Sequence, residues 1–240
     1  DRKDWPGALE AIKNGEPNNA DLLKLAQVHA FMGNQTSADS VYRAIVEKDS
    51  LSADGKFAIL EMAKAQYKQK DYPTAVATLS RRIALDPNGA EAYYFRGLSY
   101  KEMKQLPEGI ADLRQAFALA PTKAEYPFWL GVALTQANSI DASLGAFRAT
   151  VALDSTSKNA AVAWQQLGYR ALLKKDWGSA IESLEQAVVI DPRSLQSLIW
   201  LAQAYQNSGN RAKAKEYYHK VLEIQPGEPN STKGLKTLGE

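Results

Sequence analysis

The sequence predicts an all-α fold built from stacked copies of one helical hairpin, and two recurring positions carry this prediction. A small residue recurs at intervals of 34 or 37 residues, at Ala26, Ala63, Gly97, Gly131, Gly168 and Ala202. A proline recurs in step with it, at Pro87, Pro121, Pro192 and Pro226. A fixed period of this length indicates a repeated supersecondary unit rather than a single globular core.

One unit is clearest in residues 56–89. Residues 57–68 carry apolar side chains at helical spacing and predict a first helix. Asp71 is a candidate N-cap and Pro73 suits the first turn of a second helix. Residues 86–89 end that helix, because their proline disfavours a helical predecessor and their glycine permits a sharp exit. Two helices joined by so short a turn form an antiparallel hairpin.

Small side chains are expected wherever the two helices of a hairpin cross closely. The sequence offers one such pair in each unit: Ala26 with Ala38, Ala63 with Ala75, Gly97 with Gly109, Gly131 with Ser143, Gly168 with Ala180, and Ala202 with Ala214. Large side chains that share one register should fill the groove around each crossing: Tyr42, Leu79, Leu113, Phe147, Leu184 and Tyr218.

This pattern resembles the tetratricopeptide repeat (TPR) family, most closely in residues 90–123, where Ala90-Glu91-Ala92-Tyr93-Tyr94-Phe95-Arg96-Gly97 is followed by Tyr100, Gly109, Ala116 and Pro121. Six complete units are then 19–52, 56–89, 90–123, 124–157, 161–194 and 195–228. A half unit in 1–18 precedes them, and a polar capping helix in 229–240 follows. The resemblance implies one α-α superhelix over residues 1–240, a right-handed solenoid of antiparallel helix pairs.

Two three-residue insertions interrupt the period, at 53–55 and 158–160. We expect an irregular step between neighbouring units at both joints.

Composition excludes several classes of function. The net charge is +2, from 29 basic and 27 acidic residues, which argues against a nucleic-acid-binding surface. The chain has no cysteine, so it has neither disulfides nor zinc–thiolate sites. No apolar run approaches the ~20 residues of a membrane span. The compartment stays open: cytoplasmic, or periplasmic or extracellular after removal of a signal peptide.

No group of residues predicts catalysis, a metal site or a cofactor. His29 and His219 lie in distant repeats, and neither has a carboxylate at metal-ligand spacing. Glycines recur with the repeat and form no phosphate-binding loop. We therefore expect a protein that is not an enzyme.

The resemblance points to a binding groove. In the TPR family the first helices line a concave surface, and the second, fifth, ninth and twelfth places of each unit point into it. That register selects these candidate groove residues: Leu60, Lys64, Tyr67, Tyr94, Leu98, Phe128, Val132, Tyr169, Leu172, Ile199 and Gln203. The alternative is that curvature of the solenoid buries several of them against neighbouring helices.

The same register argues against one kind of ligand. Family members that grip chaperone C-termini carry Lys and Asn at the fifth and ninth places as a carboxylate clamp. This chain has Leu60/Lys64, Tyr94/Leu98 and Phe128/Val132 there, so the clamp is missing. An apolar, aromatic groove favours an amphipathic helix or an extended peptide with apolar anchors.

Two functions of different classes follow. The first is a non-catalytic scaffold that binds a protein or peptide partner in this groove. The second is a structural subunit that assembles head to tail into an oligomer or filament. The half unit motivates the second, because its apolar residues Trp5, Leu9 and Ile12 would lack the helix that normally covers them. A cleaved or recombinant fragment is the simpler explanation of the same half unit.

Overall fold

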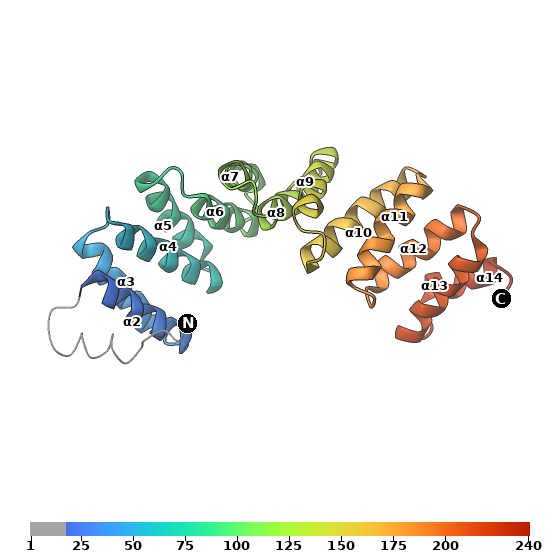
Figure 1. The fold of residues 1–240 in the computed structure, drawn as a ribbon, viewed down its shortest axis with the longest axis horizontal. Coiled ribbons are helices and arrows are strands. Elements are labelled where there is room, and N and C mark those ends of the chain that lie inside the picture. Colours follow the sequence, from blue (N-terminus) through green and yellow to red (C-terminus); the bar gives the residue numbers. More distant parts are fainter. Residues whose placement is uncertain (1–17) are drawn as a thin grey trace. The chain divides into compact units, whose positions relative to one another are not determined.

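A computed structural model describes residues 18–240, and in that part of the chain it contains thirteen helices and no strand (Figure 1). The helices are α2 (Asn19–Phe31), α3 (Gln35–Lys48), α4 (Ala53–Lys68), α5 (Tyr72–Leu85), α6 (Ala90–Glu102), α7 (Leu106–Leu119), α8 (Glu125–Gln136), α9 (Ile140–Leu153), α10 (Lys158–Leu173), α11 (Trp177–Ile190), α12 (Leu195–Asn207), α13 (Arg211–Ile224) and α14 (Pro229–Thr237). None of the described helices is long and apolar enough to cross a membrane.

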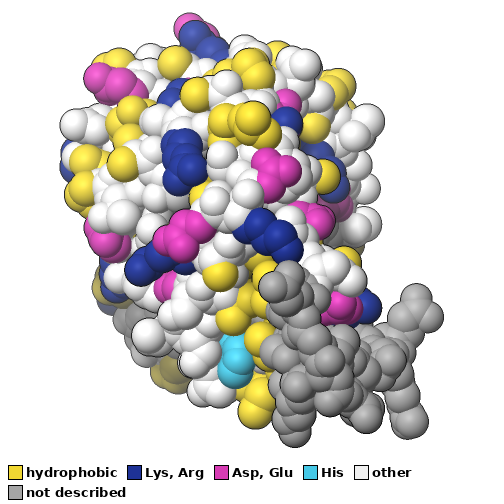
Figure 2. Space-filling view, turned by 90° about the vertical axis from the view of Figure 1, so that its left-hand side faces the viewer, with side chains coloured by type: hydrophobic (Ala, Val, Ile, Leu, Met, Phe, Trp, Pro, Cys, Tyr) yellow, Lys and Arg dark blue, Asp and Glu magenta, His cyan; other side chains and the backbone are white. Residues whose placement is uncertain are grey.

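The chain divides into two compact units, Asp1–Ala120 and Pro121–Glu240. Helices α2 to α7 belong to the first unit and α8 to α14 to the second. In each unit the helices pack as successive hairpins, α2 with α3 through α12 with α13, and the first helices of neighbouring hairpins also touch. Figure 2 looks onto the first unit, where acidic, basic and apolar side chains are mixed and no sign of charge dominates.

Small side chains do lie at the crossings of the hairpins, as the sequence predicts. All twelve members of the six predicted pairs are buried, and so are the six large residues that share a register. The contacts leave little room: a Cβ added to Gly97 would lie 2.9 Å from Cγ of Leu113, and one added to Gly109 would lie 2.9 Å from the carbonyl oxygen of Gly97. The recurring small residues are therefore explained by packing between helices.

Each hairpin turns through one residue in the left-handed conformation. These residues are Gly33, Lys70, Lys104, Asn138, Lys175 and Gly209, with φ between 56° and 88°. The turn keeps backbone hydrogen bonds to the preceding helix, such as Asp71 N–H to the carbonyl of Gln66 at 2.9 Å. Three of the six positions hold lysine, although glycine adopts this conformation at the lowest cost.

The two insertions extend helices. Helix α4 begins at Ala53, not at Phe57 as the periodicity predicts, and α10 begins at Lys158. The reason is a serine N-cap before each insertion: Ser52 Oγ accepts a hydrogen bond from Gly55 N at 3.0 Å, and Ser157 Oγ accepts one from Ala160 N at 3.2 Å. Both helices have 16 residues, about one turn more than the other first helices.

The inserted turn of α4 presses against the chain that precedes it. A Cβ added to Gly55 would lie 2.0 Å from the carbonyl oxygen of Asp49. The equivalent residue of α10, Ala160, does carry a Cβ and is fully buried.

A short polar helix closes the second unit. Helix α14 packs on α13, and its apolar side chains Leu235 and Leu238 are buried. Glu228 caps it by accepting hydrogen bonds from the backbone N–H groups of Asn230 and Ser231. Burial works against the charge of this carboxylate, but the hydrogen bonds outweigh it and lower the pKa of Glu228.

Candidate protein-binding surfaces

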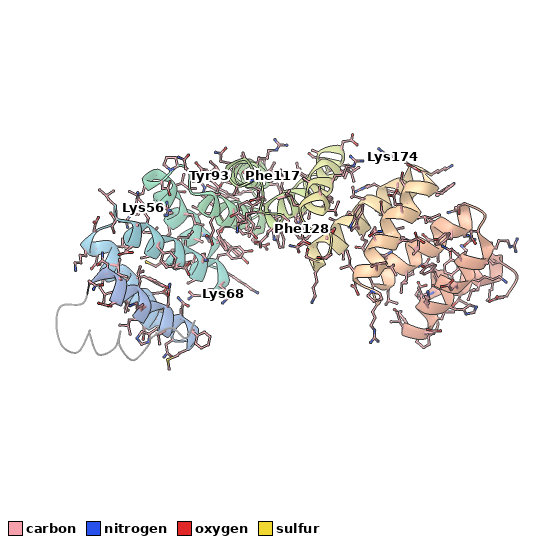
Figure 3. The ribbon with its side chains drawn as sticks, in the orientation of Figure 1. Lys56, Lys68, Tyr93, Phe117, Phe128 and Lys174 are labelled. Carbon is pink, nitrogen blue, oxygen red and sulfur yellow. The ribbon has the colours of Figure 1, made fainter. Side chains whose placement is uncertain are left out.

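The first unit has a cleft on the face formed by its first helices, α2, α4 and α6. The cleft has a volume of about 330 Å³, and its wall includes Gln35 of α3, Lys64, Tyr67 and Lys68 of α4, and Phe95 of α6. The side chain of Lys68 extends into solvent at the end of α4 (Figure 3). We call this hollow the first-unit cleft. It brings together two of the predicted groove residues, Lys64 and Tyr67.

A row of aromatic rings borders the first-unit cleft. The centroid of the Tyr67 ring lies 5.6 Å from that of Tyr72 and 5.8 Å from that of Phe95. Phe95 continues the row to Tyr94, at 5.0 Å and nearly edge to face. Tyr67, Tyr72 and Phe95 are each only partly buried, so part of this aromatic surface is open.

One cation lies against this row. Nζ of Lys64 is 2.7 Å from Glu61 Oε1 and 3.1 Å from Glu91 Oε1, so it links α4 to α6. The same ammonium group lies 5.7 Å from the centroid of the Phe95 ring. Burial alone would lower the pKa of Lys64, but the hydrogen bonds that its ammonium group donates to both glutamates outweigh it and raise the pKa. The cleft therefore combines an apolar wall with one lysine held between two glutamates.

The first-helix face of the second unit, from α8, α10 and α12, holds a second aromatic pair. The rings of Tyr169 and Trp200 are stacked, with centroids 4.2 Å apart and planes 18° apart. Nε2 of Gln165 donates to the hydroxyls of Ser194 and Ser197 at 3.3 and 3.0 Å, which ties α10 to the start of α12. Tyr169 and Trp200 are both partly exposed.

Five predicted groove residues are buried, so for them the alternative of packing between helices holds. They are Leu60, Tyr94, Leu98, Phe128 and Ile199, with 2–8% of their surface exposed. Phe128, for example, packs with Phe147 of α9 and Ala163 of α10. The physical reason is that each of these first helices packs against its own hairpin partner and against helices of a neighbouring hairpin in the same unit. These side chains stabilise the repeats and offer a partner little surface.

The remaining groove residues are partly exposed: Lys64, Tyr67, Val132, Tyr169, Leu172 and Gln203. Val132 packs beside Phe128, and Leu172 packs on the cluster around Leu184, so both contribute partly to the core. Gln203 borders a polar hollow of about 270 Å³ shared by α12, α13 and α14. The residues proposed for self-assembly, Trp5, Leu9 and Ile12, lie outside the part of the chain that the structure describes.

The prediction missed the sixth place of each repeat. Phe95 and Trp200 both occupy it and both contact a predicted groove residue, and Trp129 of α8 occupies it in a third repeat. An aromatic that recurs beside the fifth place in three units was a readable signal. The family register does not include this position, because it assigns only the second, fifth, ninth and twelfth places of each unit to the groove.

The described part of the chain shows no group of three or more His, Asp or Glu side chains suited to a metal ion. His219 pairs with the carboxylate of Glu240, at 2.8 Å, a contact that the sequence did not predict. Lys215 binds the same carboxylate at 2.9 Å. This exposed trio joins α13 to the residues after α14.

Models of one family match most of the described chain. The Tetratricopeptide repeat models cover residues 97–158 and 171–236, and a TPR repeat model covers residues 63–104. No curated protein sequence matches the chain.

Solved structures agree on the fold. YrrB, described as a TPR protein with an unusual peptide-binding site, has a TM-score of 0.68 at 19% identity, over 81% of this chain and 97% of that one. MamA has a TM-score of 0.62 at 24% identity, over 71% and 91%. A tetratricopeptide repeat protein from Parabacteroides merdae has a TM-score of 0.64 at 14% identity, over 92% and 85%. With its helical hairpins, its small residues at each crossing and these family matches, the chain is a tetratricopeptide repeat protein.

Proposed function

We propose that this protein is an interaction scaffold that binds an amphipathic helix or extended peptide on its first-helix faces, with the first-unit cleft as the principal site. The TPR fold itself suggests a protein–protein interaction scaffold, and proteins of this family are generally non-catalytic. The likeness to YrrB, whose description names a peptide-binding site, is consistent with a peptide ligand.

One observation carries the proposal: open aromatic surface beside a cleft of peptide side-chain size. Tyr67, Tyr72 and Phe95 form a row that is only partly buried, next to a hollow of about 330 Å³. Aromatic side chains supply much of the binding energy at protein interfaces, because they bury a large area at little cost in side-chain entropy. The proposed ligand places an apolar anchor against this row and polar groups near the Lys64–Glu91 pair.

A photo-crosslinking experiment tests the site directly. The photoreactive residue p-benzoylphenylalanine replaces Tyr67 in one variant and Phe117 in a control. Phe117 is also a partly buried aromatic of the first unit, but it lies on the second helix α7 and is labelled in Figure 3. We expect a discrete crosslinked partner from native extract with the photoreactive group at position 67 and none at position 117.

Substitution complements the crosslink. Tyr67→Ala should weaken capture of that partner while Phe117→Ala leaves it unchanged, and circular dichroism should show the same helix content in both. Equal crosslinking from both positions, or undiminished capture by Tyr67→Ala, would contradict the proposed site.

Head-to-tail assembly is the second candidate function, and less supports it. Helix α14 covers α13, and its outward side chains Lys233, Lys236 and Thr237 are exposed and polar. A face of this kind is poorly suited to receive an apolar half repeat from another copy. Light scattering at high protein concentration tests for assembly, and a monodisperse monomer would contradict the head-to-tail proposal.

A further inference from the structure

Two pockets occur at the same place in two different repeats. One, of about 420 Å³, is lined by α3, α4 and α5 in the first unit. The other, of about 480 Å³, is lined by α9, α10 and α11 in the second unit. In each case two second helices form the walls and the first helix between them forms the floor. We call them the α3–α5 pocket and the α9–α11 pocket.

The two pockets correspond residue by residue. Five lining positions are related by a shift of 105 residues, which is three periods of 34 plus one insertion of three. The pairs are Arg43 and Arg148, Val46 and Val151, Ile59 and Trp164, Met62 and Leu167, and Thr78 and Ser183. Each pocket thus has two apolar residues in its floor, one more in its wall, an arginine and a hydroxyl.

Both pockets also share a position relative to the insertions. The floor helices, α4 and α10, are the two first helices that carry an inserted turn. The two pockets therefore have the same construction, and each lies at a joint that carries one of the two three-residue insertions.

The charges of the pockets are complementary to an acidic ligand. Arg43 and Arg148 are exposed and form no ion pair with any residue in 18–240. Arg81 adds a second cation to the α3–α5 pocket, against the single anion Glu47. The α9–α11 pocket contains Arg148, Arg170 and Lys174 against Asp176 and Glu182. Lys174 also pairs with Asp141 at 4.0 Å, so Arg148 and Arg170 are the cations left to a ligand. Lys174 follows α10 and is largely exposed (Figure 3).

The α9–α11 pocket also contains an unused donor. Nε1 of Trp164 is buried and has no hydrogen-bond partner among the described residues. A buried donor without a partner raises the free energy of the free protein. An acceptor brought into the pocket, with a small rotation of the indole, removes that cost.

We propose that each of these pockets binds an acidic peptide segment, which places an apolar side chain on the floor and a carboxylate on the arginine. This binding is separate from that on the first-helix faces. On α4 the floor residues Ile59 and Met62 lie roughly 140° around the helix axis from Lys64 and Tyr67. A partner can therefore occupy a pocket while another segment occupies the first-unit cleft.

The test uses the full chain and a defined probe. The acidic probe is a fluorescein-labelled peptide of twelve residues that alternates leucine and glutamate at its centre. A control peptide, the lysine probe, has lysine in place of each glutamate. Fluorescence anisotropy measures binding to the wild type and to the double variant Arg43→Glu with Arg148→Glu. We expect the double variant to bind the acidic probe roughly tenfold more weakly or worse, and the lysine probe not to bind the wild type.

Arg114→Glu is the matched control. Arg114 occupies the same place of its repeat as Arg43 and Arg148 and is also exposed, but it lines neither pocket. It should leave the affinity for the acidic probe unchanged, and so should Tyr67→Ala. Equal weakening by Arg114→Glu would show that only overall charge matters and would overturn the proposal, as would absence of saturable binding.

Tryptophan fluorescence locates the bound peptide. An unlabelled acidic probe should change the emission of the wild type. Trp164→Phe should remove that change and weaken binding to the α9–α11 pocket, because phenylalanine lacks the indole donor. An emission change that persists in Trp164→Phe would place the peptide elsewhere.

Discussion

Replacing three lysines by glycine is expected to stabilise the protein. Lys70, Lys104 and Lys175 turn their hairpins with φ of 64°, 64° and 60°. This conformation costs a residue with a Cβ about 1–2 kcal/mol, whereas glycine adopts it freely but loses about 0.5–1 kcal/mol more chain entropy on folding. The net gain is about 0.5–1 kcal/mol for each site, or about 1.5–3 kcal/mol for all three.

The assay is thermal and urea unfolding of the triple variant followed by circular dichroism. For a chain of this size about 1 kcal/mol corresponds to roughly 2–4 °C, so the melting temperature should rise by several degrees. Gln186→Gly is the control, because Gln186 is exposed within α11 and glycine there should cost about 1 kcal/mol. A triple variant that melts at or below the wild-type temperature would refute the reasoning.

Other predictions concern glycine contacts and acid. Gly145→Ala should stabilise the protein by about 0.5–1 kcal/mol, because a Cβ there meets nothing within 4 Å. Gly168→Ala should destabilise it by about 1–3 kcal/mol, because the new Cβ would lie 2.6 Å from Cγ of Leu184. The urea midpoints of the two variants should therefore move in opposite directions. Glu228 has a pKa below its ordinary value of 4.5, because its hydrogen bonds outweigh its burial. Its contribution to stability is therefore complete above about pH 4.5 and disappears as the pH falls through the lowered pKa. Unfolding midpoints of the wild type and Glu228→Gln should differ at neutral pH and converge in acid; a difference that is constant with pH would argue against this role.

The fold could be predicted because the same residue pattern recurs in every repeat, so a position that is ambiguous in one repeat is resolved by comparison with the others. A single small residue such as Ala63 means little, but six in register identify a helix crossing, and all of them are buried. The starts of α4 and α10 were missed because the period places the inserted residues outside the helix. The serine caps Ser52 and Ser157 extend it by a turn, and only the local hydrogen bonds show this.

For the candidate site, the sequence predicts which side of a helix faces the groove but not how exposed each side chain is. Helical periodicity indicates which side of α4 or α8 faces a groove, and two of the residues that it selects, Lys64 and Tyr67, line one cleft. It does not indicate how deeply a side chain lies, because depth depends on the next hairpin. Leu60 and Phe128 satisfy the same register and are buried. The α3–α5 and α9–α11 pockets could not be predicted from periodicity, because each is lined by three helices and periodicity describes one helix at a time.

The contact at Gly55 limits how the repeats of this chain can be exchanged. In a chimaera that carries Lys158-Asn159-Ala160 in place of residues 53–55, the alanine methyl group would overlap the carbonyl oxygen of Asp49, 2.0 Å away. The reverse exchange removes only the buried methyl of Ala160. Segments that look equivalent in an alignment are therefore transferable in one direction only, and a library of shuffled repeats should retain glycine at the first joint while accepting either residue at the second.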